Sequence, residues 1–394
     1  YIFVSAPENV AWLLNIRGGD SPNSPVPNSR LIISKTKKIL LISETKKCKK
    51  LIKNKVINKD NFLDIKDLPK KLLELKGKNF ILDSKSCSIF FENLIKSKFK
   101  IVGREDPTYL LKAIKNKVEI DSMINAHIID GAALTKFIYW IKNINKKKIS
   151  EVEAAKKLET FRKMNKSFLY PSFDTIAGSG KNGAIVHYRA TKENCRKINK
   201  KDIFLCDSGG QYKYGTTDVT RTICFSSQKK SIKNIYTKVL KGHIAVATTN
   251  INKDNIGMKI DKRARKFLKN SNLDYEHGTG HGVGFFLNVH EGPQSITKIN
   301  KVKIKPGMVL SNEPGYYKKN YYGIRIENLV YVDKKNEKIF FKNLTMVPIE
   351  KDLINFNLLT TSEKHYLFKY HVDIYSKISK YLNQNERKWL AGFI

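Results

Sequence analysis

Residues 203–225, with the sequence IFLCDSGGQYKYGTTDVTRTICF, decide the fold of the larger part of this chain. Apolar and β-branched residues dominate both ends of the stretch, and glycines lie in its middle. This pattern predicts two strands, residues 203–207 and 219–225, that pair around a turn at Gly209-Gly210. The strands would belong to a domain of mixed helix and sheet.

Two carboxylates, Asp207 and Asp218, lie eleven residues apart on these predicted strands. Adjacent strands bring such groups side by side on one face of a sheet. Like charges at close range are unfavourable, and a bound dication removes the repulsion. The pair therefore indicates a metal site.

Further candidate ligands follow in three later segments. The stretch 277–284 (HGTGHGVG) brings imidazoles close to backbone turns that glycine permits, and Glu313 ends a predicted strand. Residues 324–328 (IRIEN) alternate at period two, which places Arg325 and Glu327 on the same face of a strand. The candidate ligand set is Asp207, Asp218, His281, Glu313 and Glu327.

Four carboxylates and one imidazole suit hard or borderline divalent metals, Mn²⁺ first and also Fe²⁺, Co²⁺ or Zn²⁺. Two metals separated by about 3.5 Å share bridging carboxylates, and a hydroxide held between them is a strong nucleophile near neutral pH. Each residue alone is more often structural, because a lone Asp on a strand usually serves a turn or a salt bridge. The ordered set as a whole predicts a two-metal hydrolytic centre.

The charge of the chain is strongly positive, with 74 Lys and Arg against 36 Asp and Glu and a formal charge of +38. A balance of this size is compatible with nucleic-acid or anionic-membrane binding. The lysines, however, are scattered over the whole chain among many Asn and Ile, which indicates compositional drift in an AT-rich genome. We therefore expect no specific nucleic-acid partner. No apolar run approaches the length that spans a bilayer, so no membrane partner is expected either.

The five cysteines include no C-x-x-C pair. An odd number without that spacing argues against a disulfide framework and a structural zinc site, and it favours a reducing, cytoplasmic compartment. The chain begins with Tyr1 rather than Met, close to an apolar stretch at residues 10–16. We expect that a natural N-terminal part is missing from this sequence.

Apolar runs and helical patterns alternate along the first hundred residues, which predicts an α/β domain. A long helix is expected at residues 116–144, and another begins at Ser150, where Ser150 and Glu153 fit a capping box. The remaining predicted strands are 31–33, 39–42, 80–82, 308–312, 323–332 and 340–348, and the remaining predicted helices are 68–76, 231–249, 261–269 and a tail beyond 358.

The combined motifs resemble the pita-bread metallopeptidases, and within them the Xaa-Pro aminopeptidases of the large, eukaryote-like cytosolic type. The resemblance covers essentially the whole chain. The matching stretches are AWLLNIRG (11–18), AIVHY (184–188), LCDSGGQY (205–212), GTTDVTRT (215–222), HGTGHGVGFFLNVHEGP (277–293), SNEPGYY (311–317) and GIRIEN (323–328).

The resemblance implies a fold of three parts. A creatinase-like N-terminal α/β domain would cover residues 1–108, a pita-bread catalytic domain residues 109–356, and a short helical C-terminal extension residues 357–394. The larger relatives carry a further N-terminal domain, which supports the idea of a truncated sequence. Such relatives form dimers, so a homodimer is implied.

The resemblance also implies roles for the metal ligands. Asp218 and Glu327 would bridge both metals, Asp207 would hold one metal, and His281 and Glu313 would hold the other. Glu313 would also act as general base and then as general acid.

The remaining site residues take substrate-facing roles by the same resemblance. His187 and His290 would bind the substrate carbonyl and stabilise the tetrahedral intermediate. His277 would line the slot for a proline ring, and Arg325 would fix the carboxylates around the metals. The implied reaction is hydrolysis of the bond between an N-terminal residue and a penultimate proline, in peptide substrates that carry proline at position two.

Alternatives from the same fold and from another class of protein stay open. A prolidase shares the ligands but prefers dipeptides, methionine aminopeptidases normally lack the added N-terminal domain, and creatinase-type enzymes lack the full metal set. A non-catalytic pita-bread binding module usually lacks ligands, whereas all five are present here. The 277–293 motif and the C-terminal extension favour the aminopeptidase.

Overall fold

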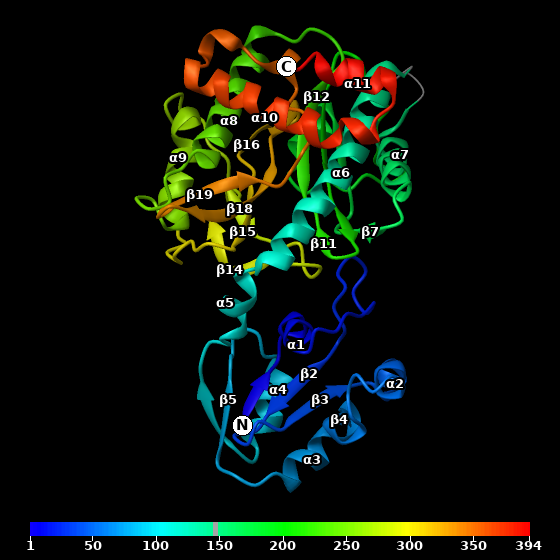
Figure 1. Ribbon diagram of the computed structural model, residues 1–394, viewed down its shortest axis with the longest axis vertical. Helices are drawn as coiled ribbons and strands as arrows, with labels where there is room; N and C mark the ends of the chain where they lie inside the picture. The colour runs from blue at the N-terminus through cyan, green and yellow to red at the C-terminus, as the bar shows by residue number, and fades with distance from the viewer. Residues whose placement is uncertain (145–148) are drawn as a thin grey trace. The chain divides into compact units, whose positions relative to one another are not determined.

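The computed structural model describes residues 1–144 and 149–394, which form two compact units, Tyr1–Lys112 and Ala113–Ile394 (Figure 1). Unit 1 is an α/β unit, and unit 2 combines several small sheets with helices. The predicted fold class is therefore confirmed. The finer division at residues 108 and 356 stays a prediction.

Unit 1 is built on one six-stranded sheet with the strand order β4-β3-β2-β1-β5-β6. The outer strand pairs, β3 with β4 and β5 with β6, are parallel. The inner pairs β1 with β2 and β2 with β3 are antiparallel. Buried apolar side chains form a core on each side of the sheet. The strands are β1 (Ile2–Val4), β2 (Arg30–Ile33), β3 (Ile39–Ser43), β4 (Phe62–Asp64), β5 (Asn79–Leu82) and β6 (Lys100–Gly103), and the helices are α1 (Pro7–Leu13), α2 (Thr45–Lys53), α3 (Leu68–Glu74) and α4 (Ile89–Lys96).

Unit 2 contains two principal sheets, a three-stranded one in the order β12-β9-β8 and a five-stranded one in the order β14-β13-β15-β18-β19. Two smaller sheets, β11-β10-β7 and β16-β17, complete it. The strands are β7 (Phe168–Pro171), β8 (Ile176–Ser179), β9 (Ile203–Ser208), β10 (Gly210–Tyr212), β11 (Gly215–Thr216), β12 (Val219–Cys224), β13 (Gly280–Gly282), β14 (Glu291–Ile296), β15 (Val309–Asn312), β16 (Gly315–Lys318), β17 (Tyr322–Arg325), β18 (Asn328–Lys335) and β19 (Lys338–Asn343).

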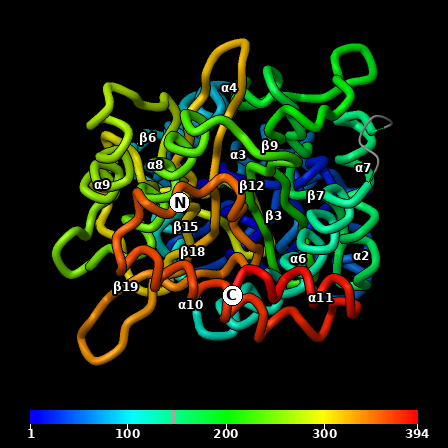
Figure 2. Tube along the Cα trace, turned by 90° about the horizontal axis from the view of Figure 1, so that it is seen from above, coloured from blue at the N-terminus to red at the C-terminus, as the bar shows by residue number. Residues whose placement is uncertain are grey.

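Helices cover the sheets of unit 2 on two sides. Figures 1 and 2 both show α8 and α9 on one side of the strands and α6 and α7 on the other. The C-terminal helices α10 and α11 close a third side, where their apolar residues join the largest core cluster. The helices of unit 2 are α6 (Lys117–Asn143), α7 (Glu151–Lys163), α8 (Lys230–Ala247), α9 (Gly257–Lys269), α10 (Thr361–Ile378) and α11 (Gln384–Ala391), with a 3₁₀ turn η4 (Gly180–Ala184) after β8. Helix α5 (Thr108–Ala113) ends where unit 2 begins in the sequence.

Local sequence signals account for several helix starts. Ser150 and Glu153 form the predicted capping box at α7, because each side chain accepts a hydrogen bond from the other's backbone N–H. Asn116 and Glu119 do the same at α6. Such caps satisfy orphan N–H groups that would otherwise remain unpaired at the first turn.

The predicted turn at Gly209-Gly210 is wrong, although β9 and β12 do pair as expected. After β9 the chain leaves this sheet and forms β10 and β11, which pair with each other in a separate sheet. Gly209 lies where the chain passes from β9 to β10, and a Cβ added there would sit 2.0 Å from the carbonyl oxygen of Thr217. The glycine is therefore needed for close backbone approach and not for a tight turn.

The predicted strand at residues 323–332 is also wrong as a single element. It divides into β17 and β18, which belong to different sheets and are separated by Ile326 and Glu327. The predicted strand 340–348 ends early, at Asn343. Beyond it, the buried carbonyls of Val347 and Pro348 accept hydrogen bonds from the Arg221 guanidinium and not from a neighbouring strand.

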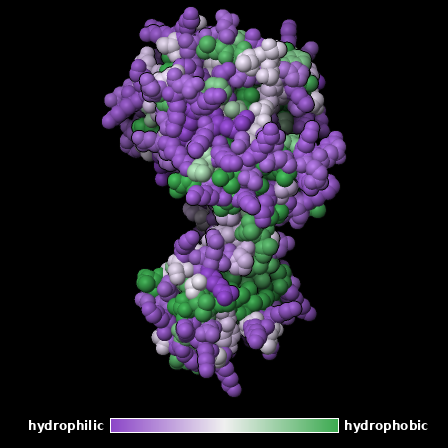
Figure 3. Space-filling view, turned by 90° about the vertical axis from the view of Figure 1, so that its left-hand side faces the viewer, coloured by the Kyte–Doolittle hydropathy of each residue, from purple (hydrophilic) through white to green (hydrophobic). Residues whose placement is uncertain are grey.

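Among the described residues, no helix is both long enough and apolar enough to cross a bilayer. On the face drawn in Figure 3, hydrophilic side chains cover most of unit 2. This surface agrees with the large excess of lysine and arginine in the sequence.

Candidate metal centre and active site

Asp207 lies in strand β9, and Asp218 directly precedes strand β12. The two strands pair antiparallel, with Asp207 opposite Thr220. Phe204 and Val219 point into the apolar core behind the sheet. The alternation of side chains in a strand therefore turns Asp207, Asp218 and Thr220 to the opposite face. Asp207 and Asp218 are buried there, with exposed fractions of 8% and 4%.

Strands β13 and β15 place His281 and Glu313. The backbone N–H of His281 donates to the Ser311 hydroxyl at 2.8 Å, and that hydroxyl donates to Glu313 Oε1 at 3.0 Å. An added Cβ at Gly280 would lie 2.0 Å from the carbonyl oxygen of Ser311. Among the glycines of residues 277–284 none has a positive φ. They permit close approach of strands, not the turns expected from the sequence.

Glu327 lies in the break between β17 and β18, and three contacts fix it there. Its backbone N–H donates to the carbonyl of Thr220 at 3.1 Å, and the Thr220 hydroxyl donates to Glu327 Oε2 at 2.8 Å. The buried Arg221 guanidinium donates to the Glu327 carbonyl at 2.6 Å and to the Tyr370 hydroxyl of α10 at 3.1 Å. The C-terminal helix therefore supports the backbone of this carboxylate.

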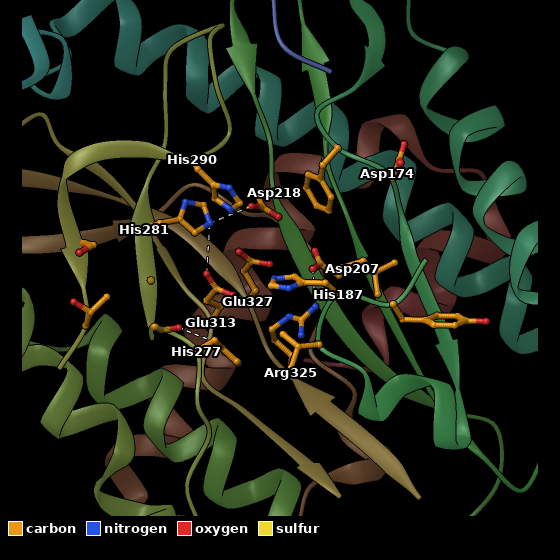
Figure 4. Close-up of a pocket in the computed structure, with 18 of the residues that line it drawn as sticks. Asp174, His187, Asp207, Asp218, His277, His281, His290, Glu313, Arg325 and Glu327 are labelled. Carbon is orange, nitrogen blue, oxygen red and sulfur yellow. Dashed lines mark hydrogen bonds and ion pairs between the residues drawn. The ribbon is translucent and has the colours of Figure 1, made fainter. Parts of the chain in front are cut away.

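Three candidate ligands converge closely. The ligand atoms of Asp218, His281 and Glu327 all lie within 4.8 Å of one another. His281 Nε2 lies 3.5 Å from Asp218 Oδ2 and 3.4 Å from Glu313 Oε1 (Figure 4). These separations are longer than hydrogen bonds, and they leave room for a cation between the groups.

The tautomer of His281 follows from its second nitrogen. Nδ1 lies 2.8 Å from the carbonyl oxygen of Gly282. A carbonyl only accepts, so Nδ1 carries the proton and Nε2 presents its lone pair to Asp218 and Glu313. Metal-binding histidines are commonly oriented by such a hydrogen bond.

The electrostatics of the cluster favour a cation. Burial raises the pKa of Asp218 well above its ordinary value, and the charges of Asp207 and Glu313 raise it further. Burial likewise raises the pKa of Glu327, and Asp218 and Glu313 add to the effect. Both carboxyls resist ionisation in the protein alone, whereas a dication would stabilise their charged forms.

Asp207 is held differently. Arg325 Nη2 donates to Asp207 Oδ2 at 2.6 Å, and both side chains are buried. The other oxygen, Oδ1, is buried and has no hydrogen-bond partner in the described part of the chain. A buried carboxylate oxygen without a donor is unfavourable unless a cation occupies that direction.

Arg325 connects this carboxylate to the histidine side of the cavity. Its Nη1 donates to the Tyr317 hydroxyl at 2.6 Å, and its Nε donates to the Thr220 hydroxyl at 3.0 Å. His277 Nδ1 donates to the Gly278 carbonyl, so its Nε2 accepts from the Tyr317 hydroxyl at 2.8 Å. The hydrogen bonds therefore run in one direction, with Arg325 donating to Tyr317 and Tyr317 donating to His277.

Two further histidines face the cluster in Figure 4. His187 lies in the loop after η4 and points toward Asp207 and Glu327. The His290 ring stands nearly perpendicular to His281, with ring centroids 4.2 Å apart. Burial lowers the pKa of His290 to about 4, and His281 adds to the effect, so this imidazole is neutral at pH 7.

The candidate ligands, Arg325 and the histidines described above border one cavity of about 530 Å³. Aromatic, aliphatic and polar side chains complete its wall. Its lining includes every site residue expected from the sequence, namely His187, Asp207, Asp218, His277, His281, His290, Glu313, Arg325 and Glu327.

Sequence reasoning missed the residues that hold these side chains in place. Thr220, Ser311 and Tyr317 each hydrogen-bond a predicted site residue. Thr220 and Ser311 had a local signal, because each lies two positions from a predicted ligand, Asp218 and Glu313 respectively. Tyr317 acts through a contact with His277 that only the folded chain creates.

The arrangement fits divalent cations. The donor set combines carboxylate oxygens with one oriented imidazole, the ligand types that Mn²⁺, Co²⁺ and Zn²⁺ accept. The unpartnered Asp207 Oδ1 and the two buried acids with raised pKa values are the features that a cation would satisfy.

Comparison with known families matches three segments of the chain. Residues 121–334 match the metallopeptidase family M24, and residues 1–119 match the creatinase/prolidase N-terminal domain. Residues 338–392 match the C-terminal region of peptidase M24.

Individual relatives resemble nearly the whole chain. A probable Xaa-Pro aminopeptidase P from Pyrenophora tritici-repentis is 40% identical over 406 residues, which cover 97% of this chain and 68% of the relative. The crystal structure of an X-prolyl aminopeptidase from Caenorhabditis elegans, described as a cytosolic enzyme with a di-nuclear active site, superposes with a TM-score of 0.87 at 31% identity. That match covers 99% of this chain and 67% of the other.

The fold is shared more widely. Prolidase from Pyrococcus furiosus superposes with a TM-score of 0.70 at 27% identity, over 87% of this chain and 95% of the other. This chain thus spans about two thirds of the length of the first two relatives and nearly all of the third.

Proposed function

The chain belongs to metallopeptidase family M24, and from this premise we propose that it is a metal-dependent Xaa-Pro aminopeptidase. The enzyme would hydrolyse the bond between an N-terminal residue and a penultimate proline. The observation that carries the proposal is the convergence of Asp218, His281 and Glu327 within 4.8 Å, beside a buried Asp207 oxygen that lacks a donor.

Asp207, Asp218, His281, Glu313 and Glu327 would hold two divalent metal ions, for which we propose Mn²⁺. Such ions would lower the pKa of bound water, polarise a carbonyl and so supply a hydroxide nucleophile. Metal analysis of the purified protein, together with hydrolysis of an X-Pro-X peptide, tests the proposal. A metal-free protein that stays inert with Mn²⁺, Co²⁺ and Zn²⁺ alike would contradict it.

Glu313 is placed to move protons. Its carboxylate lies 3.4 Å from His281 Nε2 and accepts from the Ser311 hydroxyl, which fixes its orientation. We assign it the role of general base toward the attacking water and then of general acid toward the leaving nitrogen. The leaving group needs this proton, because expulsion of an unprotonated prolyl nitrogen is unfavourable.

His187 and His290 would hold the substrate carbonyl. A neutral imidazole donates an N–H without bringing a permanent charge, and the lowered pKa of His290 keeps it in that form. Donors aimed at the oxygen stabilise the negative charge that develops there in the tetrahedral intermediate.

The imide of an Xaa-Pro bond has no N–H to donate, and its nitrogen carries a ring. A site for it therefore needs an apolar slot in place of a backbone acceptor. His277 would form one wall of that slot, because both of its nitrogens are already occupied by Gly278 and Tyr317. Its ring presents a face and no free polar group.

Replacement of His290 by alanine tests the assigned division between metal binding and turnover. We expect kcat to fall by about 10²- to 10³-fold, the usual effect of removing one oxyanion donor. Metal content should stay at the wild-type value, because His290 is not a ligand. Steady-state kinetics and elemental analysis measure the two quantities. His365→Ala, an exposed histidine of α10, is the matched control, and metal loss in His290→Ala would show that its role is misassigned.

A prolidase-like Xaa-Pro dipeptidase is the second candidate, because the Pyrococcus prolidase has the same fold. Peptide length separates the two activities. We expect the tripeptide Arg-Pro-Pro to be cleaved at least about tenfold more efficiently, in kcat/KM, than the dipeptide Gly-Pro, a difference of about 1.4 kcal/mol. Release of the N-terminal residue measures both rates, and a preference for Gly-Pro would assign the chain to the dipeptidases.

We also propose a homodimer in the cytoplasm, in line with the cytosolic enzyme from Caenorhabditis elegans. No specific nucleic-acid partner is proposed. A non-catalytic binding module is disfavoured because the chain retains every ligand of the set. Polyanion binding that persists in Asp218→Asn, without peptidase activity under any metal, would favour that reading.

A further inference from the structure

His187 lies on a loop with little regular structure of its own. Between η4 and β9, residues 185–202 contain no helix or strand, apart from a single bridge that joins Lys197 to Ser150. Ile185, His187 and Arg189 are all exposed. A loop with so few buried contacts is expected to be mobile unless specific contacts restrain it, yet His187 must hold a fixed direction toward the cavity.

Tyr188 is buried in this loop, as is Ile198 near the loop's far end. The exposed fraction of Tyr188 is 6%, and its ring packs with Ile176 and Leu205 in the wall of the cavity. Its hydroxyl donates to Glu151 Oε2 at 2.8 Å and accepts from Asn182 Nδ2 at 2.8 Å. The side chain next to His187 is therefore fixed at its far end.

Glu151 gathers four segments around one carboxylate. It is the first residue of α7, and its side chain is fully buried. Besides Tyr188, its donors are the Asn182 amide at 2.9 Å, the Ser179 N–H at 2.6 Å and the Arg196 N–H at 2.8 Å. A buried carboxylate that is satisfied by several donors, at a helix N-terminus, is a rigid anchor.

The other substrate-facing histidine has a similar arrangement. His290 is followed by Glu291, whose carboxylate forms an ion pair with Lys115 Nζ. Both of these side chains are buried, at 0% and 2% exposure of their side-chain atoms. In each case the histidine faces the cavity, and the next residue binds a buried charged side chain that does not line the cavity. Tyr188 binds Glu151, and Glu291 binds Lys115.

We propose that the Glu151–Tyr188 hydrogen bond positions His187 for catalysis, an inference that rests on the proposed function. Glu151 and Tyr188 are positioning residues: they act through the direction of the His187 imidazole and not on the reacting atoms. Misplacement of a catalytic group by about 1 Å can lower the rate by about 10²-fold. The anchor is therefore a determinant of turnover and not only of stability.

Tyr188→Phe removes the hydroxyl, together with its contacts to Glu151, Asn182 and Asn194, and keeps the ring. The phenyl ring keeps the packing with Ile176 and Leu205, and Glu151 keeps the donors of Ser179, Asn182 and Arg196. The fold should therefore survive. We expect kcat to fall by about 10- to 100-fold, with KM changed less than about threefold and metal content unchanged. Tyr366→Phe, which removes a hydroxyl bonded to Asn343 on another element, is the matched control and should retain wild-type kcat.

A double-mutant cycle separates positioning from general destabilisation. If Tyr188 acts through His187, Tyr188→Phe should cause no further loss of kcat in a His187→Ala background. Independent, multiplicative losses would overturn the proposal, and so would a Tyr188→Phe variant with wild-type kcat. Glu151→Gln, which replaces one acceptor oxygen by an NH2 group that only donates, should reproduce the Tyr188→Phe effect.

The NMR signals of the histidine rings test the inference without any activity measurement, and so separately from the proposed function. The chain has eight histidines, few enough for ring resonances to be assigned by substitution. In Tyr188→Phe the His187 ring signal should shift or broaden, whereas the signals of His281 and His371 should not move. An unchanged His187 signal would overturn the inference. A wild-type protein without peptidase activity would instead overturn the proposed function alone.

Discussion

Replacement of Asp218 by asparagine is expected to abolish peptide hydrolysis and, at the same time, to stabilise the metal-free protein. Asp218 shares the metal cluster with His281 and Glu327, so its loss should lower kcat/KM by about 10³-fold or more, equivalent to about 4 kcal/mol. The gain in stability follows from burial, which raises the pKa of Asp218 well above its ordinary value. Asparagine retains the shape of the Asp218 side chain but carries no group that ionises, so the cost of a buried charge disappears.

The sign of the stability effect depends on pH and on metal. Because the folded pKa is raised, the carboxyl contributes full stability below its unfolded pKa of about 3.9, and this stability is lost as pH rises through the folded pKa. Asp218→Asn should therefore match the wild type near pH 3.5 and unfold at a higher temperature near pH 7.5. Saturating metal should reverse the order, because only the wild type gains binding free energy.

Thermal unfolding with and without chelator measures this reversal, and each kcal/mol should move the Tm by about 2–4 °C. Asp373→Asn on the exposed face of α10 is the matched control. A variant that is less stable than the wild type without metal would show that the Asp218 carboxylate contributes favourably to the bare protein. The electrostatic account given for the cluster would then be wrong.

The sequence predicts those elements whose causes are local. The pairing of β9 with β12 follows from an apolar segment and a segment rich in β-branched residues, and the α7 start follows from Ser150 and Glu153. Both compositions favour strands without any knowledge of the neighbours.

Tertiary contacts decide the elements that the sequence misjudged. The alternation in residues 323–332 predicts one strand, but the Arg221 guanidinium binds the Glu327 carbonyl and the chain breaks there. Helix α9 begins at Gly257, four residues before the predicted start at residue 261. A glycine is a poor helix former, yet an added Cβ there would lie 1.8 Å from the Ser295 carbonyl, so the packing of α9 on β14 requires it.

The candidate site likewise contains residues that the sequence reveals and residues that only the folded structure reveals. Metal-type ligands carry their chemistry in the residue itself, so the ordered carboxylates and histidines are recognisable in the sequence. The side chains that orient them are ordinary residues, such as Thr220, Tyr317 and Glu151, whose partners Glu327, His277 and Tyr188 are far away in the chain. Only folding shows that Glu151, 37 positions from Tyr188, is the anchor of the His187 loop.

Replacement of Arg325 by methionine is expected to destabilise the metal-free protein by about 3–5 kcal/mol, the range found when one partner of a buried ion pair is removed. Arg325 and Asp207 form that pair at 2.6 Å, with side-chain exposures of 2% and 11%. Methionine fills a similar volume but leaves the carboxylate without its cation. Bound metal would compensate Asp207 directly, so the loss should be smaller with saturating metal than with chelator.

Arg325→Lys separates charge from geometry in this prediction. Lysine keeps the cation but cannot donate at once to Asp207, Thr220 and Tyr317, as the guanidinium does. It should recover part of the stability while kcat remains about 10- to 100-fold low, the usual effect of disturbing groups that orient metal ligands. Denaturant unfolding at two metal concentrations and steady-state kinetics measure both effects. If Arg325→Met lost the same stability with and without metal, Asp207 would not be a metal ligand, because a bound cation must relieve an uncompensated carboxylate that it touches.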